Sequence, residues 1–426
     1  MELNTSLDLS LEPSDGVAPD PLPREMHSPW PGTPDLIAND DEALHVARSL
    51  AVKFAPQAAL RDRERQLPWA ELDAFVASGL WGITVPREFG GAGVRNGTLA
   101  EVTATISEAD GSLGQIPQNH FYALEVLRVG GSVEQQRFFY QRVLAGERFG
   151  NALAEIGHKD FKRRTQLTRA SEGWHVDGRK FYCTGALYAH WIPTLVVADD
   201  EGRDVTYLAF VPRDTPGVTV TDDWDGFGQC VTGSGSVQFE HVRVEPEWVV
   251  PFQVSFEHAT TIGPVAQIMH AAIDLGQARG AFDAALQFVR ERSRPWIDAK
   301  VERAADDPLT IAQFGDLAVR LRAAEALLRR AGRFVDAAQA KPTDRSVAEA
   351  SVAVAEARAL STTVSLDAGS RLFELAGTAA TLDGLGLDRF WRNARTHTLH
   401  DPVRWKYHAV GNFYLNDKLP PRHGAL

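Results

Sequence analysis

Apolar residues recur every three or four positions in two parts of the chain, and this spacing predicts amphipathic helices there. In the first part we expect helices over about 44–54, 69–76, 99–106 and 132–143. In the last part, long Ala-rich stretches predict helices over about 258–292, 307–340, 346–376 and 384–411. Between them, short runs rich in Val, Thr, Tyr and Phe predict strands over 194–198, 205–211, 218–221 and 236–240.

Local signals refine these elements. Asp40 and Asp41 are candidate N-caps for the first helix, and Ser132 with Gln135 forms a capping-box start. Residues 199–202, Asp-Asp-Glu-Gly, suit a hairpin connection. No helix-length segment separates the strands, so the middle part is an antiparallel β domain and not a βαβ unit.

The pattern divides the chain into four segments. Residues 1–38 are rich in Pro, Ser, Asp and Gly, and we expect a flexible arm. An N-terminal helical domain follows at 39–146, then a barrel-like β domain at 147–252 and a long helical bundle at 253–426.

Composition excludes several function classes. The chain has 426 residues, 44% of them hydrophobic and 23% charged, with a formal net charge of -12. Such an acidic balance argues against nucleic acid or an anionic membrane as partner. No apolar run reaches spanning length, and no signal-peptide layout begins the chain. Two cysteines, Cys183 and Cys230, favour a reducing cytoplasm over a disulfide framework.

Candidate chemistry concentrates near the C-terminus, in residues 388–402. His397 and His400 are three residues apart and would share one face of a helix. An imidazole, with an unperturbed pKa near ~6.5, can give or take a proton at neutral pH. A metal site here would need a third ligand that the sequence does not nominate, so we predict no metal.

Five motifs, taken together and in order, resemble the acyl-CoA dehydrogenase superfamily from about residue 40 onward. Within it the likeness is greatest to the flavin-dependent monooxygenase branch, which includes dibenzothiophene monooxygenases and sulfur-acquisition oxidoreductases. The motifs occupy residues 79–93, 109–114, 178–186, 294–296 and 389–402. The resemblance implies a helical domain, a central β domain and a C-terminal four-helix bundle, assembled as a homotetramer.

Departures from the dehydrogenases indicate a changed reaction. Where those enzymes carry a proton-abstracting Glu followed by Gly, this chain has His400 and Asp401. The other position where dehydrogenases carry the proton-abstracting carboxylate corresponds to about Ala266, which is not acidic. The Gly-rich segment that holds the FAD pyrophosphate is replaced by residues 373–380, and its loss suggests FMN instead of FAD.

The resemblance also implies roles for individual residues. His400 would manage a peroxide proton, with Thr184 and Asn151 positioning it. The same relationship assigns Gln115, Asn119 and His120 to the substrate. The residues implied in flavin binding are Tyr182, Thr184, Asn151, Trp224, Ser234, His397, and Arg292 and Arg294, which reach the flavin phosphate of a neighbouring subunit.

The expected activity is therefore a two-component monooxygenase. A separate NAD(P)H-dependent reductase would supply reduced FMN, O2 would form a C4a-hydroperoxyflavin, and one oxygen atom would pass to a small organosulfur compound. The alternative is a flavin dehydrogenase or oxidase acting on a non-CoA substrate, with His400 as base. A third possibility, a non-catalytic flavin carrier, predicts tight flavin binding without turnover.

Overall fold

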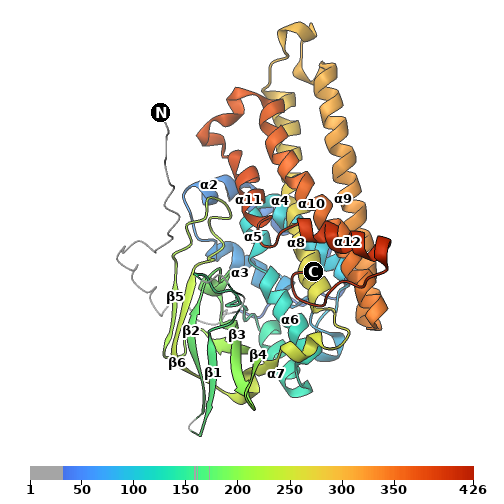
Figure 1. Cartoon of the computed structure of the whole chain (residues 1–426). Helices are drawn as coiled ribbons and strands as arrows, with labels where there is room; N and C mark the ends of the chain where they lie inside the picture. The colour runs from blue at the N-terminus through green and yellow to red at the C-terminus, as the bar shows by residue number, and fades with distance from the viewer. Residues whose placement is uncertain (1–31, 158–159, 161, 172) are drawn as a thin grey trace, which may run out of the picture.

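The computed structural model describes residues 32–157, 160, 162–171 and 173–426, so most of the predicted 1–38 arm lies outside the described residues. Helices precede and follow one β-sheet, as the periodicity predicts (Figure 1). The N-terminal helices are α1 (Asp40–Phe54), α2 (Ala58–Arg63), α3 (Trp69–Ala77), α4 (Asn96–Ala109), α5 (Gly111–Gln115), α6 (Gln118–Gly130) and α7 (Val133–Leu144).

Helix starts follow the local signals with one correction. Ser132 and Gln135 form the predicted capping box of α7. The first helix, however, is capped by Asn39, whose side chain accepts from the Glu42 backbone N–H. Asp40 lies one residue inside the helix, where its carboxylate instead accepts a hydrogen bond from the backbone N–H of Arg95.

The seven strands form one sheet in the order β5-β6-β2-β1-β3-β4-β7. Neighbouring strands are antiparallel except β1 and β3, which pair in parallel through Gln166 and Val197. The predicted hairpin joins β3 to β4. The strands are β1 (Gln166–Ala170), β2 (Gly173–Lys180), β3 (Trp191–Asp200), β4 (Arg203–Pro212), β5 (Val218–Thr221), β6 (Ser236–Val244) and β7 (Val249–Pro251).

The C-terminal part needs a second correction. The stretch predicted as one helix over 384–411 is two short helices, broken at residues 398–403, because Pro402 disfavours helical backbone before it. The other three predicted helices are long, as expected. The helices are α8 (Ile262–Glu291), α9 (Pro308–Ala340), α10 (Asp344–Ala376), α11 (Asp388–His397) and α12 (Arg404–Asn416).

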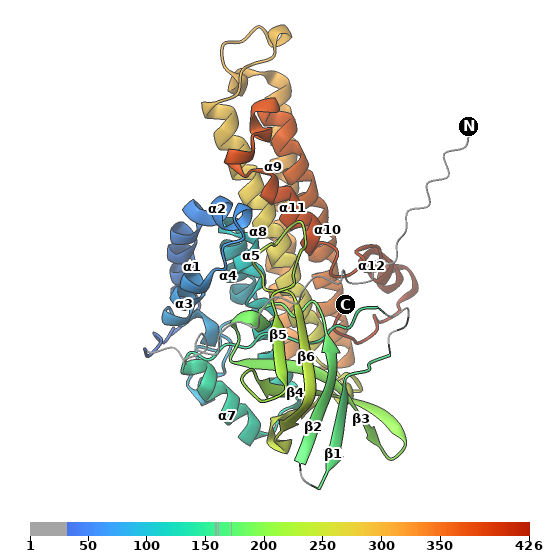
Figure 2. The ribbon, with the colours of Figure 1, turned by 90° about the vertical axis from the view of Figure 1, so that its left-hand side faces the viewer.

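Helix α8 organises the molecule. It packs against α4 on one side and α10 on the other, and most of its residues in the first five turns are buried. The sheet lies beside its N-terminal half, and the far ends of α8, α9 and α10 project beyond the rest of the fold (Figure 2). Helix α7 ends at Leu144, β1 begins at Gln166 and β7 ends at Pro251, and the domain boundaries near 146 and 252 stay a prediction.

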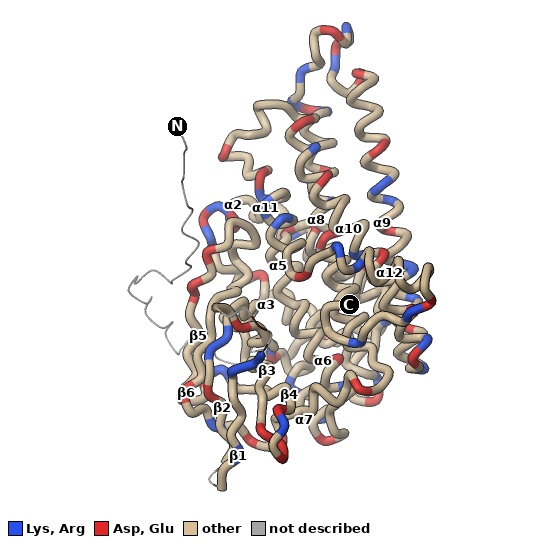
Figure 3. The backbone as a smooth tube through the Cα atoms, viewed as in Figure 1, with Lys and Arg blue, Asp and Glu red and all other residues tan. Residues whose placement is uncertain are grey.

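Charge is distributed over the whole backbone. Along the described backbone, positions of acidic and basic residues are interspersed on the helices and strands (Figure 3). Among the described residues, no helix combines the length and apolarity that a bilayer crossing requires.

Candidate active site

A cavity of about 890 Å³ lies where the sheet meets the helices. This volume is in the upper range of small-molecule sites. Its walls come from the sheet side, from α5, α6 and α8, from the break after α11, and from the C-terminal tail at 422–425. The tail is held over α8 by a hydrogen bond of 3.0 Å from Gln267 Nε2 to the Gly424 carbonyl.

Hydroxyl groups line the sheet side of the cavity. The chain leaves β2 and turns at Tyr182, whose φ is +55°. Two backbone hydrogen bonds then join this turn to residues 232–235, with N···O distances of 3.0 and 3.1 Å. The pairing brings Thr184 Oγ1 within 2.8 Å of Ser234 Oγ, which in turn lies 2.6 Å from Thr232 Oγ1. The result is a buried row of hydroxyls, of which Thr184 and Ser234 line the cavity.

Asn151 reaches the same wall because two backbone segments approach closely. A Cβ on Gly150 would lie 2.6 Å from the backbone of Ala186, so only glycine fits there. This contact sets Asn151 beside the turn, and its Nδ2 donates to the Thr184 carbonyl over 3.3 Å.

Aromatic rings flank this row. Tyr182 is 50% exposed, and its ring centroid lies 6.1 Å from that of Trp224 in an edge-on arrangement. Trp224 is fixed by its indole N–H, which donates to the Gln229 carbonyl over 3.0 Å. Both rings line the cavity, so a planar ligand can contact aromatic faces beside hydroxyl and amide groups.

On the opposite wall, Gln115 and Asn119 enter the cavity from α5 and α6. Gln115 Nε2 lies 3.3 Å from His400 Nε2. Its Oε1 is buried and has no hydrogen-bond partner in the protein. A buried acceptor without a partner is costly, and a bound ligand that donates to it would remove that cost.

His400 lies in the break after α11, and its exposed ring lines the cavity. Its Nδ1 donates to the His397 carbonyl over 2.7 Å, so Nε2 is the nitrogen without a proton in the neutral ring. Burial lowers the pKa of His400, against the raising effect of the bond to the His397 carbonyl, and the Arg358 charge lowers it further. The resting site therefore offers a neutral imidazole acceptor.

Carboxylates are nearly absent from the cavity. Among the described residues that line it, Asp401 is the only acid, and Lys406 Nζ lies 3.2 Å from its Oδ1. Ala266, the other position where a proton-abstracting acid was considered, lines the cavity as an apolar side chain. The site has imidazoles where a dehydrogenase would need a carboxylate base.

Behind His400 lies a second pair of imidazoles. His397 is fully buried and does not line the cavity; its Nδ1 lies 2.5 Å from Asp274, and its Nε2 lies 3.0 Å from His270 Nδ1. His270 does line the cavity. The sequence reasoning missed it, although His270 and Asp274 are four residues apart on α8 and thus share one face.

The three imidazoles lie within 4.8 Å of one another through one nitrogen each, which is close enough to share a metal ion. A hydrogen bond already joins the two nearest nitrogens, and the Arg358 guanidinium lies 2.6 Å from Asp274. A dication would meet that fixed positive charge, so we keep the prediction of no metal.

His120 does not reach the cavity. It is completely buried, its Nε2 hydrogen bonds the Trp81 carbonyl at 2.9 Å, and its Nδ1 accepts from the Phe149 backbone N–H at 3.1 Å. Both ring nitrogens are therefore occupied by backbone, and we withdraw the substrate role that the resemblance implied.

Arg292 and Arg294 also lie away from this cavity. They are exposed at the C-terminal end of α8, in the part of the bundle that projects from the fold. Any contact of these two guanidinium groups with a flavin would be with that of another subunit.

Three family models match the chain. They describe the acyl-CoA dehydrogenase N-terminal domain at residues 41–147, the middle domain at 157–242 and the C-terminal domain at 268–405. The chain belongs to the acyl-CoA dehydrogenase family, and the predicted fold class is confirmed.

Two relatives that match over nearly their full length are monooxygenases by name. Dibenzothiophene monooxygenase of Rhodococcus erythropolis is 36% identical over 90% of this chain and 95% of its own. The probable FMNH2-dependent monooxygenase SfnC of Pseudomonas putida is 33% identical over 89% and 96%.

Solved structures give the same picture. The FMN-bound TdsC of a Paenibacillus species superposes with a TM-score of 0.86 at 35% identity, over 90% of this chain and all of the other. Methanesulfinate monooxygenase MsuC of Pseudomonas fluorescens has a TM-score of 0.84 at 32% identity, over 90% and 99%.

Proposed function

We propose that this protein is a two-component, FMNH2-dependent monooxygenase that transfers one oxygen atom to a small organosulfur compound. The observation that carries the proposal is the pairing of a neutral imidazole, His400, with a cavity whose only acid among the described residues is neutralised by lysine. The acyl-CoA dehydrogenases that the chain resembles use a free carboxylate at this place. The names of dibenzothiophene monooxygenase, SfnC and MsuC point to the same activity.

FMN suits the groups that line the cavity. The isoalloxazine ring system is planar and carries hydrogen-bond donors and acceptors along its edge. Thr184, Ser234 and Asn151 supply matching polar groups, and Tyr182 and Trp224 supply aromatic surfaces. Reduced FMN, when bound, activates O2 so that one oxygen atom can be transferred to a nucleophile.

His400 holds or gives up the proton that the reaction requires. Its Nδ1 is fixed by the His397 carbonyl, which keeps Nε2 directed to the cavity and to the Gln115 amide. A fixed tautomer spares the reaction any ring rearrangement. Thr184 and Asn151 position the oxygen from the opposite wall.

Exclusion of water is the second task of the protein. The C-terminal tail closes one side of the cavity, and Lys406 pins it by bonding both Gln267 Oε1 at 2.9 Å and the Ala425 carbonyl. Apolar side chains such as Leu195, Phe252 and Phe256 complete the walls. Such walls suit a neutral or weakly polar organosulfur substrate and slow attack by water.

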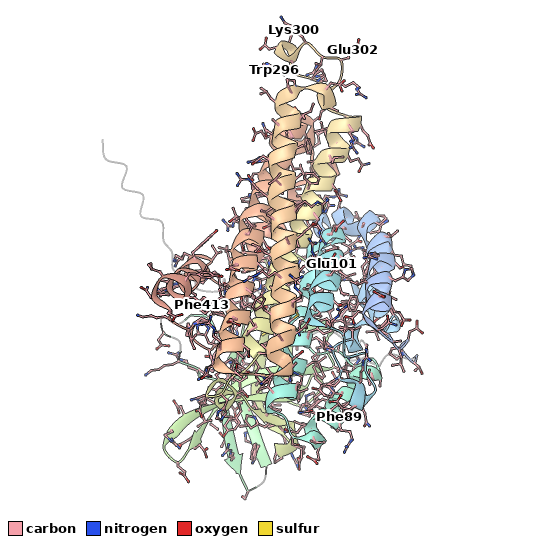
Figure 4. The ribbon with its side chains drawn as sticks, turned by 90° about the vertical axis from the view of Figure 1, so that its right-hand side faces the viewer. Phe89, Glu101, Trp296, Lys300, Glu302 and Phe413 are labelled. Atoms are coloured by element: carbon pink, nitrogen blue, oxygen red, sulfur yellow. The ribbon has the colours of Figure 1, made fainter. Side chains whose placement is uncertain are left out.

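We further propose a homotetramer in which Arg292 and Arg294 bind the flavin phosphate of a neighbouring subunit. The guanidinium fork suits a phosphate. Figure 4 shows Trp296, Lys300 and Glu302 at the free end of the long helices, far from Phe89 and Phe413. Trp296 and Ile297 are 71% and 81% exposed there, an apolar end that a second subunit would cover. We place the enzyme in the cytoplasm, with a separate NAD(P)H-dependent reductase.

The experiment compares two ways of loading the flavin. In anaerobic mixtures with oxidised FMN and candidate substrates such as an aryl sulfide or methanesulfinate, we expect no bleaching. With a flavin reductase, NADH and air, we expect oxygenated product formed in proportion to NADH. Bleaching by substrate alone would instead establish a dehydrogenase or oxidase.

A further inference from the structure

His270, His400 and His423 line the cavity, and only His270 is joined through a second imidazole to a buried carboxylate. His400 rests on a backbone carbonyl. His270 rests on His397, and His397 rests on Asp274, which is completely buried. The 5.0 Å between the ring centroids of His270 and His400 brings both rings to the same part of the cavity.

Hydrogen-bond direction fixes the tautomers along this row. A carboxylate only accepts, so His397 Nδ1 carries a proton and its Nε2 does not. His270 Nδ1 must then be the donor in the 3.0 Å bond to His397 Nε2. This leaves His270 Nε2 as a bare acceptor on a ring that lines the cavity.

The charges around the row are balanced at rest. Arg358 Nη1 and Thr362 Oγ1 both donate to Asp274 Oδ2, over 2.6 and 2.7 Å. Burial first, and then neighbouring positive charges, hold the pKa values of His270 and His397 well below the usual range, so both rings are neutral. The groups that face His270 are Asp274 on its own helix, His397, His400, Arg358 and Lys406.

We propose that His270 is a second proton-transfer residue of the cavity, with His397 and Asp274 as its positioning residues. The proposal deepens the proposed function and rests on it. It adds to the site a proton path that runs from the cavity through His270 and His397 toward Asp274.

The path balances without a further reactant. A proton from a group in the cavity bonds to His270 Nε2, the His270 Nδ1–H bond breaks, and an Nε2–H bond forms on His397. The positive charge then lies beside the Asp274 carboxylate, and the reverse sequence returns the proton. His400 has no such carboxylate partner, so a proton taken up there stays on that ring.

A substitution of Asp274 tests which nitrogens donate and which accept in the hydrogen bonds that join His270, His397 and Asp274. In Asp274→Asn, Arg358 only donates and keeps the amide oxygen, so the NH2 group faces His397. His397 Nδ1 must then accept a hydrogen bond, so the proton of His397 moves to Nε2. His397 Nε2–H donates to His270 Nδ1, and His270 therefore carries its proton on Nε2, facing the cavity. Thr362→Val is the matched control, because it removes one hydrogen bond to Asp274 but leaves the carboxylate in place.

The first readout is nitrogen NMR of histidine-labelled protein without flavin, with the His270 signals assigned from His270→Gln. We expect a bare Nε2 in the wild type and in Thr362→Val, and Nε2–H in Asp274→Asn. Two results would overturn the proposal: a wild-type His270 that carries its proton on Nε2, or a His270 tautomer that is the same in Asp274→Asn as in the wild type. This readout is independent of any turnover.

The second readout is the pH profile of oxygenation. In His270→Gln we expect kcat to fall by about 10- to 100-fold and one limb of the profile to disappear, with FMN affinity and melting temperature unchanged. If the wild type forms oxygenated product and His270→Gln has the same kcat and pH profile, the relay is refuted and the proposed function stands. Absence of oxygenated product in the wild type would refute the proposed function, and the NMR result would still decide the relay.

Discussion

His120 and His400 are two histidines of one protein with opposite surroundings: His120 is completely buried, and His400 is exposed to the cavity. Around His120, a backbone carbonyl and a backbone N–H occupy both ring nitrogens, and Trp81, Phe121 and Phe149 pack against the ring. Around His400, one nitrogen is bound and the other opens on a cavity. The partner of each ring nitrogen therefore distinguishes the structural imidazole from the chemical one: both nitrogens of His120 are bound by backbone, and one nitrogen of His400 is open to a ligand.

The largest effect that this comparison predicts is on catalysis. Replacing His400 by Gln removes the titratable nitrogen but keeps a side chain that can hydrogen bond. We expect kcat for oxygenation to fall by about 100-fold or more. FMN affinity, measured by fluorescence quenching, should change little.

His400→Gln at wild-type kcat would remove His400 from the reaction. A matched substitution at His408, which is exposed on α12, controls for the loss of a histidine as such.

The second effect is on stability. His120→Ala leaves the Trp81 carbonyl and the Phe149 N–H unpaired in the core and opens a cavity among aromatic rings. We expect the free energy of unfolding to fall by about 2–5 kcal/mol, as measured by urea titration. At temperatures where the variant is folded, kcat should stay within about threefold of wild type.

A large fall in kcat with unchanged stability would reverse the comparison, since it would give His120 a chemical role.

The third effect is the pH dependence that His120 imposes. Burial lowers its pKa from 6.5 to about 3, against the raising effect of the bond to the Trp81 carbonyl. The unfolded chain therefore binds a proton that the folded chain does not between these values, so stability falls as the pH decreases from about 6.5 toward 3. We expect His120→Gln to flatten that part of the stability curve, followed by thermal melting across the range.

An equal slope in wild type and His120→Gln would show that other groups carry the acid sensitivity.

The smallest effect concerns the hydroxyl row. Ser234→Ala removes the hydroxyl that joins Thr184 and Thr232. A single neutral hydrogen bond contributes about 1 kcal/mol, so we expect FMN affinity to weaken by about fivefold. Titration of FMN fluorescence measures this, with Ser346→Ala at the start of α10 as a control far from the cavity. Equal affinity in the two variants would take the hydroxyl row out of flavin binding.

The sequence predicted the order of the elements because hydrophobic periodicity and capping residues act locally. Ser132 and Gln135 are three residues apart, and both partners of the capping box are visible in the chain. Pro402 marks the break after α11, because proline disfavours helix before it, although the apolar period continues through the break. Asn39, Asp40 and Asp41 are equally good N-cap residues by type, so the sequence does not single out Asn39.

The site was less accessible to sequence reasoning. The pairing of His270 with His397 joins residues 127 apart in the chain, and no local pattern shows which faces of α8 and α11 meet. The place of His120 likewise depends on Trp81 and Phe149, which come from separate segments. Contacts of this kind follow from packing, so the resemblance could name candidate residues but not their surroundings.

The most direct test of the central claim uses isotopically labelled dioxygen. The protein is mixed with photoreduced FMN, labelled O2 and an organosulfur substrate, and the product is analysed by mass spectrometry beside a sample in labelled water. The account predicts one labelled oxygen atom in the product from dioxygen and none from water, with the yield sharply reduced in His400→Gln. Product without label from dioxygen, or dehydrogenated product without added oxygen, would contradict it.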